Sequence, residues 1–246
     1  MQTAKDIIIK PIGASDARRL VKRLHYSGKV VQNSSLHLGV FMGDKCQGVM
    51  QFGSCINKKG TMNLVKDTGW NEFIELNRMA FSDALPRNSE SRAIGIAMRL
   101  IKKNYPHIKW VISFADGTQC GDGTIYRASG FSLVGISKNT ALRVNPDTGE
   151  AMHVIQAHHL KMSKRFRSWK AFEGYQLKYV FFIDKKCKEK LTLPELPFSK
   201  IDEMGAGMYK GIKRVTKATS GVQLESGGAI PTNTLQTNKA VQDGAA

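Results

Sequence analysis

Two hydrophobic patterns interleave along the first 185 residues of the chain. Short apolar or alternating runs predict strands at 4–10, 36–42, 46–53, 73–82, 110–116, 131–137 and 175–184. Helical periodicity with start and stop signals predicts helices over 16–27, from about Ser89 to the residue before Pro106, and over 124–129. Because strands and helices interleave in one chain, the predicted class is α/β, a central sheet flanked by helices.

The remaining segments have weaker patterns. Residues 54–71 are polar and predict a loop from which Trp70 packs back, and 152–159 suits either a strand or a helix start. We expect a catalytic domain over 1–185, which includes the basic, aromatic-rich segment 160–185. A basic extension over 186–217 follows, and 218–246 has so little to bury that we predict a disordered tail.

Residues 109–134 place a carboxylate at a position suited to chemistry. The run WVISFAD puts Asp116 at the end of a buried strand, and open α/β sheets place their ligands at the carboxyl ends of strands. A glycine-rich turn over 117–123 follows, and a short helix with Tyr126 then stops at Gly130. We therefore treat this strand, loop and helix as the candidate site.

Net charge favours a polyanionic partner. The 37 Lys and Arg residues exceed the 20 Asp and Glu residues by 17, and the isoelectric point is near 9.8. Such a surplus favours nucleic acid over a membrane surface, because neutralised phosphates release counterions. Positive charges alternate with aromatic rings after residue 160, and the expected nucleic-acid contacts are Lys161, Lys164, Arg165, Arg167, Trp169 and Lys170. The alternative is an amphipathic helix with its aromatic residues in the core.

Cysteine and hydropathy patterns indicate a cytoplasmic protein. The four cysteines include no CxxC spacing, so reduced thiols are expected. No apolar run approaches the roughly 20 residues needed to cross a bilayer, and no membrane partner is expected. His153, His158 and His159 lack a metal-ligand spacing, so they are interpreted as surface or packing residues.

The order strand, Asp, loop, short helix with Tyr, Gly-Phe and strand resembles the second half of the GNAT acyltransferase fold. This resemblance implies a mixed central sheet with Tyr126 beside the leaving group of an acyl donor. In CoA-dependent GNAT proteins, a glycine-bearing loop holds the pyrophosphate at a helix N-terminus. Here Ser89 and Ser91 stand at that loop, so a standard CoA grip is in doubt, although hydroxyls can also donate to an anion.

Several motifs together resemble the Mom family of phage DNA modification proteins over roughly residues 5–185. They are HYS at 25–27, ELNRMAFSDALPRNSESR at 75–92, FADG, IYRASGF and the basic segment. The resemblance implies that the exocyclic amine of adenine in double-stranded DNA becomes carbamoylmethylated, which shields phage DNA from restriction inside the infected bacterium. It implies catalytic roles for His25, Tyr26, Asp116 and Tyr126, and donor binding by Arg78, Ser89 and Ser91. The resemblance also implies a bound iron ion, for which the candidate ligands are His25, Tyr26, Asp116 and Tyr126.

The expected chemistry assigns Asp116 as the base and Tyr126 as the acid or oxyanion donor, with the target base flipped out of the duplex. The donor is left open between an activated glycyl unit, plausibly glycyl-tRNA, and acetyl-CoA with its methyl group activated by a metal. The glycyl route would add tRNA as a partner.

Two other functions remain open at this stage. A small-molecule or protein N-acetyltransferase would explain the fold, and a non-catalytic DNA-binding protein would explain the charge. The oligomeric state is also open, a homodimer included.

Overall fold

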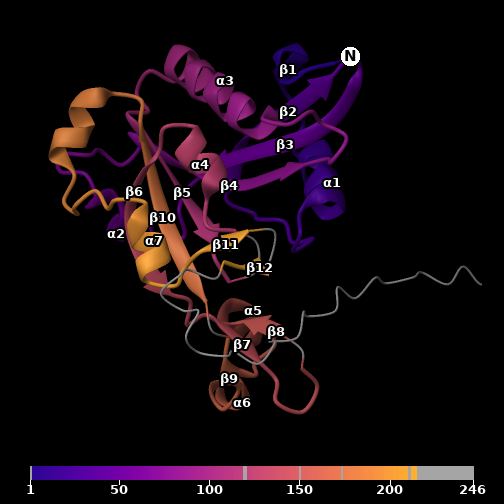
Figure 1. The fold of residues 1–246 in the computed structure, drawn as a ribbon, viewed down its shortest axis with the longest axis vertical. Coiled ribbons are helices and arrows are strands. Elements are labelled where there is room, and N and C mark those ends of the chain that lie inside the picture. Colours follow the sequence, from indigo (N-terminus) through magenta and orange to yellow (C-terminus); the bar gives the residue numbers. More distant parts are fainter. Residues whose placement is uncertain (1, 119–120, 150, 173, 210–211, 215–246) are drawn as a thin grey trace, which may run out of the picture. The chain divides into compact units, whose positions relative to one another are not determined.

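Seven strands form the main sheet in the order β1-β2-β3-β4-β5-β10-β6 (Figure 1). All neighbours are antiparallel except β4 and β5, which are parallel. The strands are β1 (Ile7–Pro11), β2 (Ser34–Met42), β3 (Lys45–Gly53), β4 (Phe73–Phe81), β5 (Trp110–Asp116), β6 (Ser132–Lys138) and β10 (Tyr175–Phe182). This arrangement confirms the predicted mixed α/β sheet of GNAT type.

The computed structural model describes residues 2–118, 121–149, 151–172, 174–209 and 212–214. The predicted tail over 218–246 lies outside the described residues, as do 215–217 of the predicted basic extension. Within the described ranges, no helix is both long enough and apolar enough to span a bilayer.

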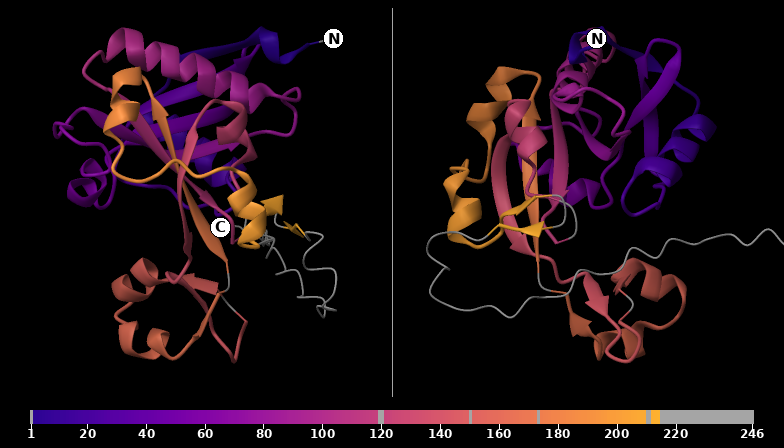
Figure 2. Two further views of the ribbon diagram at one scale, coloured as in Figure 1. Left: turned by 60° about the vertical axis from the view of Figure 1, so that its left-hand side comes forward. Right: turned by 45° about the vertical axis from the view of Figure 1, so that its right-hand side comes forward.

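Helices cover both faces of the sheet (Figure 2). The larger ones are α1 (Ala14–Leu24) and α3 (Ser89–Asn104), and the shorter ones are α2 (Lys58–Met62), α4 (Thr124–Ala128) and α7 (Ser199–Glu203). Two short 3-10 helices, η1 (Ala4–Asp6) and η2 (Lys185–Lys190), also belong to this part of the chain. Helix α2 lies within the segment that was predicted to be a loop, and Trp70 does not pack back, since it is 54% exposed under the Lys58 ammonium.

Side chains alternate between the two faces, as the pleat of a strand requires. On β5, Val111 and Ala115 pack in the core beneath α3, whereas Trp110 and Ile112 pack in the core on the other face. Helix α1 packs on β3 and β4 through a separate small core that contains Val49. The core beneath α3 and the cores on the opposite face are therefore distinct environments.

Strands β4 and β5 separate before they end. Their pairing covers only Phe73–Glu75 on β4 and Trp110–Ile112 on β5. Beyond that point both strands continue, and Asn77 is an extra residue in the ladder between β4 and β3, a β-bulge. Bulges bend a strand and redirect its side chains, so the bulge and the separation together open a gap at the carboxyl ends of β4 and β5.

Residues between β6 and β10 form a second, three-stranded sheet in the order β8-β7-β9. Its elements are β7 (Leu142–Val144), β8 (Ala151–His153), β9 (Lys170–Ala171), α5 (Val154–His159) and α6 (Ser163–Arg167). It has its own small core, which contains Phe166 and Trp169. The stacking role expected of Trp169 is therefore corrected, since its ring is 4% exposed and packs inside the protein.

The chain after β10 returns to the main sheet. Residues 190 and 192 bond to the backbone of 66 and 64, and Leu196 N–H donates to the carbonyl oxygen of Leu133. The short strands β11 (Met208–Tyr209) and β12 (Ile212–Lys213) follow α7. The described part of the predicted basic extension is thus packed against the catalytic domain.

Candidate active site

Asp116 ends β5 at the gap and is held on both carboxylate oxygens. Its Oδ1 accepts the Thr118 N–H at 2.9 Å, and its Oδ2 accepts the Tyr26 hydroxyl at 3.2 Å. The structure therefore brings together two residues that the sequence places 90 positions apart. A carboxylate held by two donors, one of them on a half-exposed ring, is oriented and still reachable.

The HYS segment follows the end of α1 at Leu24, three residues earlier than the sequence predicted. The Nδ1 atom of His25 accepts the Ser27 N–H at 3.2 Å, which assigns the ring proton of the neutral tautomer to Nε2. The His25 and Tyr26 rings lie 4.3 Å apart between centroids. Burial, followed by the nearby Arg78 guanidinium, lowers the pKa of His25 from 6.5 to about 4, so this imidazole is neutral at pH 7.

Arg78 follows the bulge on β4 and braces the HYS side of the gap. It donates through Nη1 to the Asn77 carbonyl at 2.8 Å and through Nε to the Lys29 carbonyl at 3.2 Å. Arg78 lies on the same face of β4 as Ala80, and Ala80 belongs to the core beneath α1. Arg78 thus lies near His25. It does not lie with Ser89 and Ser91, the two serines that were predicted to bind the donor together with it.

Tyr126 of α4 approaches from the face beneath α3. Its hydroxyl oxygen lies 2.8 Å from Ser113 Oγ, which also donates to the Leu76 carbonyl at 3.1 Å. The Ser113 hydroxyl thus lies within hydrogen-bonding distance of both the Leu76 carbonyl and the Tyr126 hydroxyl oxygen, and it holds that oxygen in place. The Tyr126 ring is 9% exposed, so its hydroxyl is held in place by packing as well as by hydrogen bonding.

Asp116 and Tyr126 thus lie on opposite faces of the sheet. Ser113 contacts Tyr126 on the face beneath α3, and Asp116, three residues later on β5, turns to the other face, where Tyr26 meets it. Ladder pairing between β4 and β5 has already ended before Ser113 and Asp116, so both residues belong to the part of β5 that is not paired with β4.

Ser89 and Ser91 begin α3 beside the gap. Ser89 is fully buried, and its hydroxyl donates to the Pro86 carbonyl at 2.6 Å. The Ser91 hydroxyl donates to the Asn88 carbonyl at 3.2 Å and lines a groove of about 430 Å³ with Lys5, Arg92 and Arg99. The anion contacts predicted for the two hydroxyls stay a prediction, and the three cations of this groove are the groups that sequence reasoning missed.

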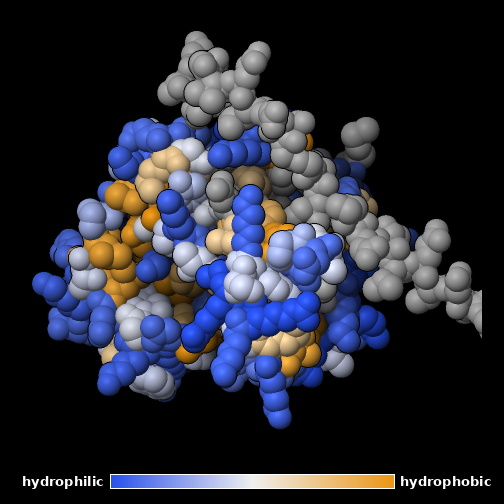
Figure 3. Space-filling model, turned by 90° about the horizontal axis from the view of Figure 1, so that it is seen from below, coloured by the Kyte–Doolittle hydropathy of each residue, from blue (hydrophilic) through white to orange (hydrophobic). Residues whose placement is uncertain are grey.

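The cations predicted to bind nucleic acid are exposed on the small sheet and its helices. They are Lys161, Lys164, Arg165, Arg167 and Lys170. Figure 3 shows hydrophilic side chains over much of the face that is seen from this end of the molecule. Lys161 has a φ of 55°, a left-handed position at the end of α5 where glycine is usual.

The four residues proposed as iron ligands do not fit a converged metal site. Asp116 and Tyr26 are in contact, whereas the Tyr126 hydroxyl is engaged by Ser113 on the opposite face and His25 Nδ1 is engaged by Ser27. Within the described ranges, no group of three or more His, Cys, Asp or Glu residues is arranged to hold a metal ion. We derive no step through a metal.

Other site residues were not found from the sequence. Lys29 donates to the Gln156 side chain at 2.8 Å, which links the HYS segment to α5 of the small sheet. Three residues before Gln156 is His153, half-buried, whose pKa is lowered by burial and by Lys29 and raised by Asp116. Their signals were absent from local patterns because these contacts join distant parts of the chain.

Comparison with known proteins assigns the family. The sequence profile of the Mom protein family matches residues 6–200. The chain is 35% identical over 200 residues to the methylcarbamoylase mom of Escherichia phage Mu, which covers 77% of this chain and 80% of that protein. The chain belongs to the Mom protein family.

Solved structures similar to this Mom family member are distant acetyltransferases. The spermidine/spermine N-acetyltransferase of Vibrio cholerae has a TM-score of 0.45 at 8% identity and covers 76% of this chain and 98% of that one. The ribosomal-protein-S18-alanine N-acetyltransferase of Escherichia coli has a TM-score of 0.42 at 10% identity, covering 72% and 94%. We base the fold on the strand order.

The neutral state of His25 predicts acid-sensitive stability. Histidine in the unfolded chain titrates near pH 6.5. Between pH 6.5 and about 4, the unfolded chain therefore binds a proton at this position while His25 in the folded protein stays neutral. The contribution is therefore present above pH 6.5 and lost as the pH falls. Urea unfolding should show the wild type losing about 2 kcal/mol more than His25→Asn across this interval, after discounting the ring's solvent contact. Equal losses in the two proteins would contradict the assignment.

Proposed function

We propose that this Mom family protein is a transferase that converts the exocyclic amine of adenine in duplex DNA to a carbamoylmethyl derivative and so protects phage DNA from restriction. The observation that supports it best is the contact of the Tyr26 hydroxyl with Asp116 at the end of β5, in a chain 35% identical to a methylcarbamoylase. Adenine enters on the face of Asp116 and Tyr26, and the donor on the face of Tyr126.

Asp116 acts as the general base. The exocyclic amine of adenine is a weak nucleophile because its lone pair is delocalised into the ring, so removing a proton during attack lowers the barrier. Thr118 and Tyr26 fix the carboxylate, and each of its oxygens keeps a lone pair that can accept the proton of the amine. The Tyr26 ring is 54% exposed and backed by His25, and it provides an aromatic face against which a flipped base can stack.

Tyr126 acts on the donor side. Its hydroxyl is positioned by Ser113, and from there it donates to the developing oxyanion or protonates the leaving group. The donor carries negative charge on its carrier, which agrees with Lys5, Arg92 and Arg99 around the groove at the start of α3. These cations suit either the phosphates of CoA or those of a tRNA end.

Atom balance favours a glycyl donor. Attack of the adenine amine on a glycyl ester forms an amide, and the glycyl amine then attacks the ring carbon through a five-membered ring. The original nitrogen leaves that carbon and becomes the terminal amide, so no other reactant is consumed. An acetyl group lacks the amide nitrogen, and joining its methyl carbon to nitrogen removes two electrons, so that route needs a nitrogen source and an oxidant.

The activity is tested in bacteria that carry a plasmid and express the protein. Nucleosides from the plasmid should contain an adenosine heavier by the carbamoylmethyl group, and Asp116→Asn should lower its yield by about a hundredfold or more because the base is lost. Lys102→Gln, at an exposed cation on α3, is the control for expression and should match the wild type. Unmodified plasmid from well-folded wild-type protein would contradict the proposal.

The route is tested with an isotope. Adenine labelled with heavy nitrogen at the exocyclic position should give a product whose label is lost when the side-chain amide is hydrolysed to the acid. Retention of the label on the ring after hydrolysis would exclude the glycyl rearrangement and support direct alkylation.

DNA affinity should depend on the cations of α6. We expect Lys164→Gln with Arg167→Gln to weaken binding to a labelled duplex and to reduce the slope of log Kd against log salt by about 2, since each lost phosphate contact removes about 0.9. Lys102→Gln with Lys103→Gln removes the same charge from exposed positions on α3 and is the matched control. Equal effects of the two pairs would place the DNA elsewhere.

A further inference from the structure

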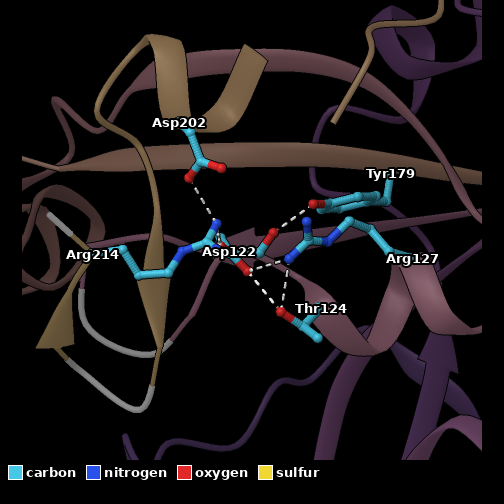
Figure 4. Close-up of polar contacts among 6 residues, drawn as sticks. All are labelled: Asp122, Thr124, Arg127, Tyr179, Asp202 and Arg214. Carbon is cyan, nitrogen blue, oxygen red and sulfur yellow. Dashed lines mark hydrogen bonds and ion pairs between the residues drawn. The ribbon is translucent and has the colours of Figure 1, made fainter. Parts of the chain in front are cut away.

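Asp122 is a buried acid held by two arginines (Figure 4). Its side chain is 1% exposed and pairs with Arg127 at 3.2 Å and, at a shorter distance, with Arg214. The Thr124 hydroxyl donates at 3.0 Å to Asp122 Oδ1, the oxygen that Arg127 contacts. The loop between Asp116 and Tyr126 therefore carries, at its centre, a carboxylate whose partners come from α4 and from the C-terminal segment.

Arg214 ties that segment to the loop. It pairs with Asp202 at 3.0 Å as well as with Asp122, and its backbone N–H donates to the Gly207 carbonyl at 3.0 Å. Asp122 N–H in turn donates to the Met208 carbonyl at 3.0 Å. Side chain and backbone thus both connect the loop to the C-terminal segment, and the side-chain bond joins residues that lie 92 positions apart.

The C-terminal end of the loop is fixed against Tyr179. Gly123 has a φ of 82°, and a Cβ there would lie 2.4 Å from the Tyr179 ring, so the position admits only glycine. The Tyr179 hydroxyl donates to the Asp122 carbonyl, and its ring centroid is 5.2 Å from that of Tyr126. A shift of Asp122 is therefore transmitted to the ring that packs on Tyr126.

The N-terminal end of the loop is equally confined. A Cβ at Gly117 would lie 2.9 Å from the Tyr175 carbonyl and 3.3 Å from that of Ala206, and Gly121 N–H donates to the Asp116 carbonyl at 3.1 Å. Gly117 thus lies between β10 and the C-terminal segment.

We propose that Arg214 is a positioning residue for the proposed reaction: by holding Asp122, it fixes the loop that sets Asp116 and Tyr126 on opposite sides of the gap. The inference rests on the proposed function. Arg214 and Asp202 lie beyond residues 6–200, the part that the family profile matches. A buried ion pair is weak evidence for net stability, and the role assigned to this one is to hold the loop in a single arrangement.

The test compares Arg214→Gln with Arg214→Lys in the full chain. We expect Arg214→Gln to lower the plasmid modification level at least about tenfold, because small displacements of catalytic groups are costly. Affinity for a labelled duplex should change less than about twofold, as one cation among many. Arg214→Lys keeps a charge that can reach Asp122 and should recover most of the modification.

Lys200→Gln is the matched control, since it removes one cation from the neighbouring α7, where Lys200 pairs with the exposed Glu203. It should modify DNA as the wild type does. Hydrogen exchange supplies a readout that is independent of catalysis: peptides from the loop after Asp116 should exchange faster in Arg214→Gln when both proteins are measured well below their unfolding midpoints, because removing one partner of a buried carboxylate also lowers global stability.

The outcomes separate the two proposals. Wild-type modification and loop exchange in Arg214→Gln would overturn the positioning role, and so would a loss of modification that merely follows a lower unfolding midpoint or weaker DNA binding. If the wild type itself left DNA unmodified, the proposed function would fail. Loop exchange alone would then decide the placement of the loop by Arg214, faster exchange supporting it and unchanged exchange overturning it.

Discussion

A backbone left without a strand partner inside a protein must find its hydrogen bonds elsewhere, and the separation of β4 from β5 creates this need at the centre of the sheet. Ser113 Oγ serves the Leu76 carbonyl, and Arg78 serves the carbonyls of Asn77 and Lys29. The groups that satisfy the open backbone are the same ones that position Tyr126 and the HYS segment. The same hydrogen bonds therefore both compensate for the separation of the two strands and hold the site residues in place.

The alternation of side chains on β5 then gives the site its two sides. Ser113 and Asp116 differ by an odd number of residues, so one meets Tyr126 beneath α3 and the other meets Tyr26 near α1. The proposed reaction uses both faces, with adenine on the side of Asp116 and the donor on the side of Tyr126.

Periodicity along the chain predicted all seven strands of the main sheet and its two long helices, because each buries a long, regular face. The small sheet was not predicted, since its strands are two or three residues long and are stabilised by contacts with α5 and α6. Asp116 was predictable because it directly follows an apolar run. Ser113 was hidden within that run, and the partners of Asp122 are set by tertiary contacts that no local pattern encodes.

Net charge is the clearest signal in the sequence, yet the structure divides the cations into two kinds. Some guanidinium groups bind inside the protein, to carbonyls in the case of Arg78 and to Asp122 in the case of Arg127 and Arg214. The planar guanidinium group is well suited to such internal hydrogen bonds. Arg143 likewise donates to the carbonyls of Arg167 and Trp169 within the small sheet. The cations that remain free to meet phosphate are mainly those on exposed helices and turns, Lys161 and Lys164 among them. A basic composition therefore combines exposed cations, which suit a polyanionic partner, with internal arginines that bond to carbonyls and to Asp122, and only the placement of each side chain separates the two kinds.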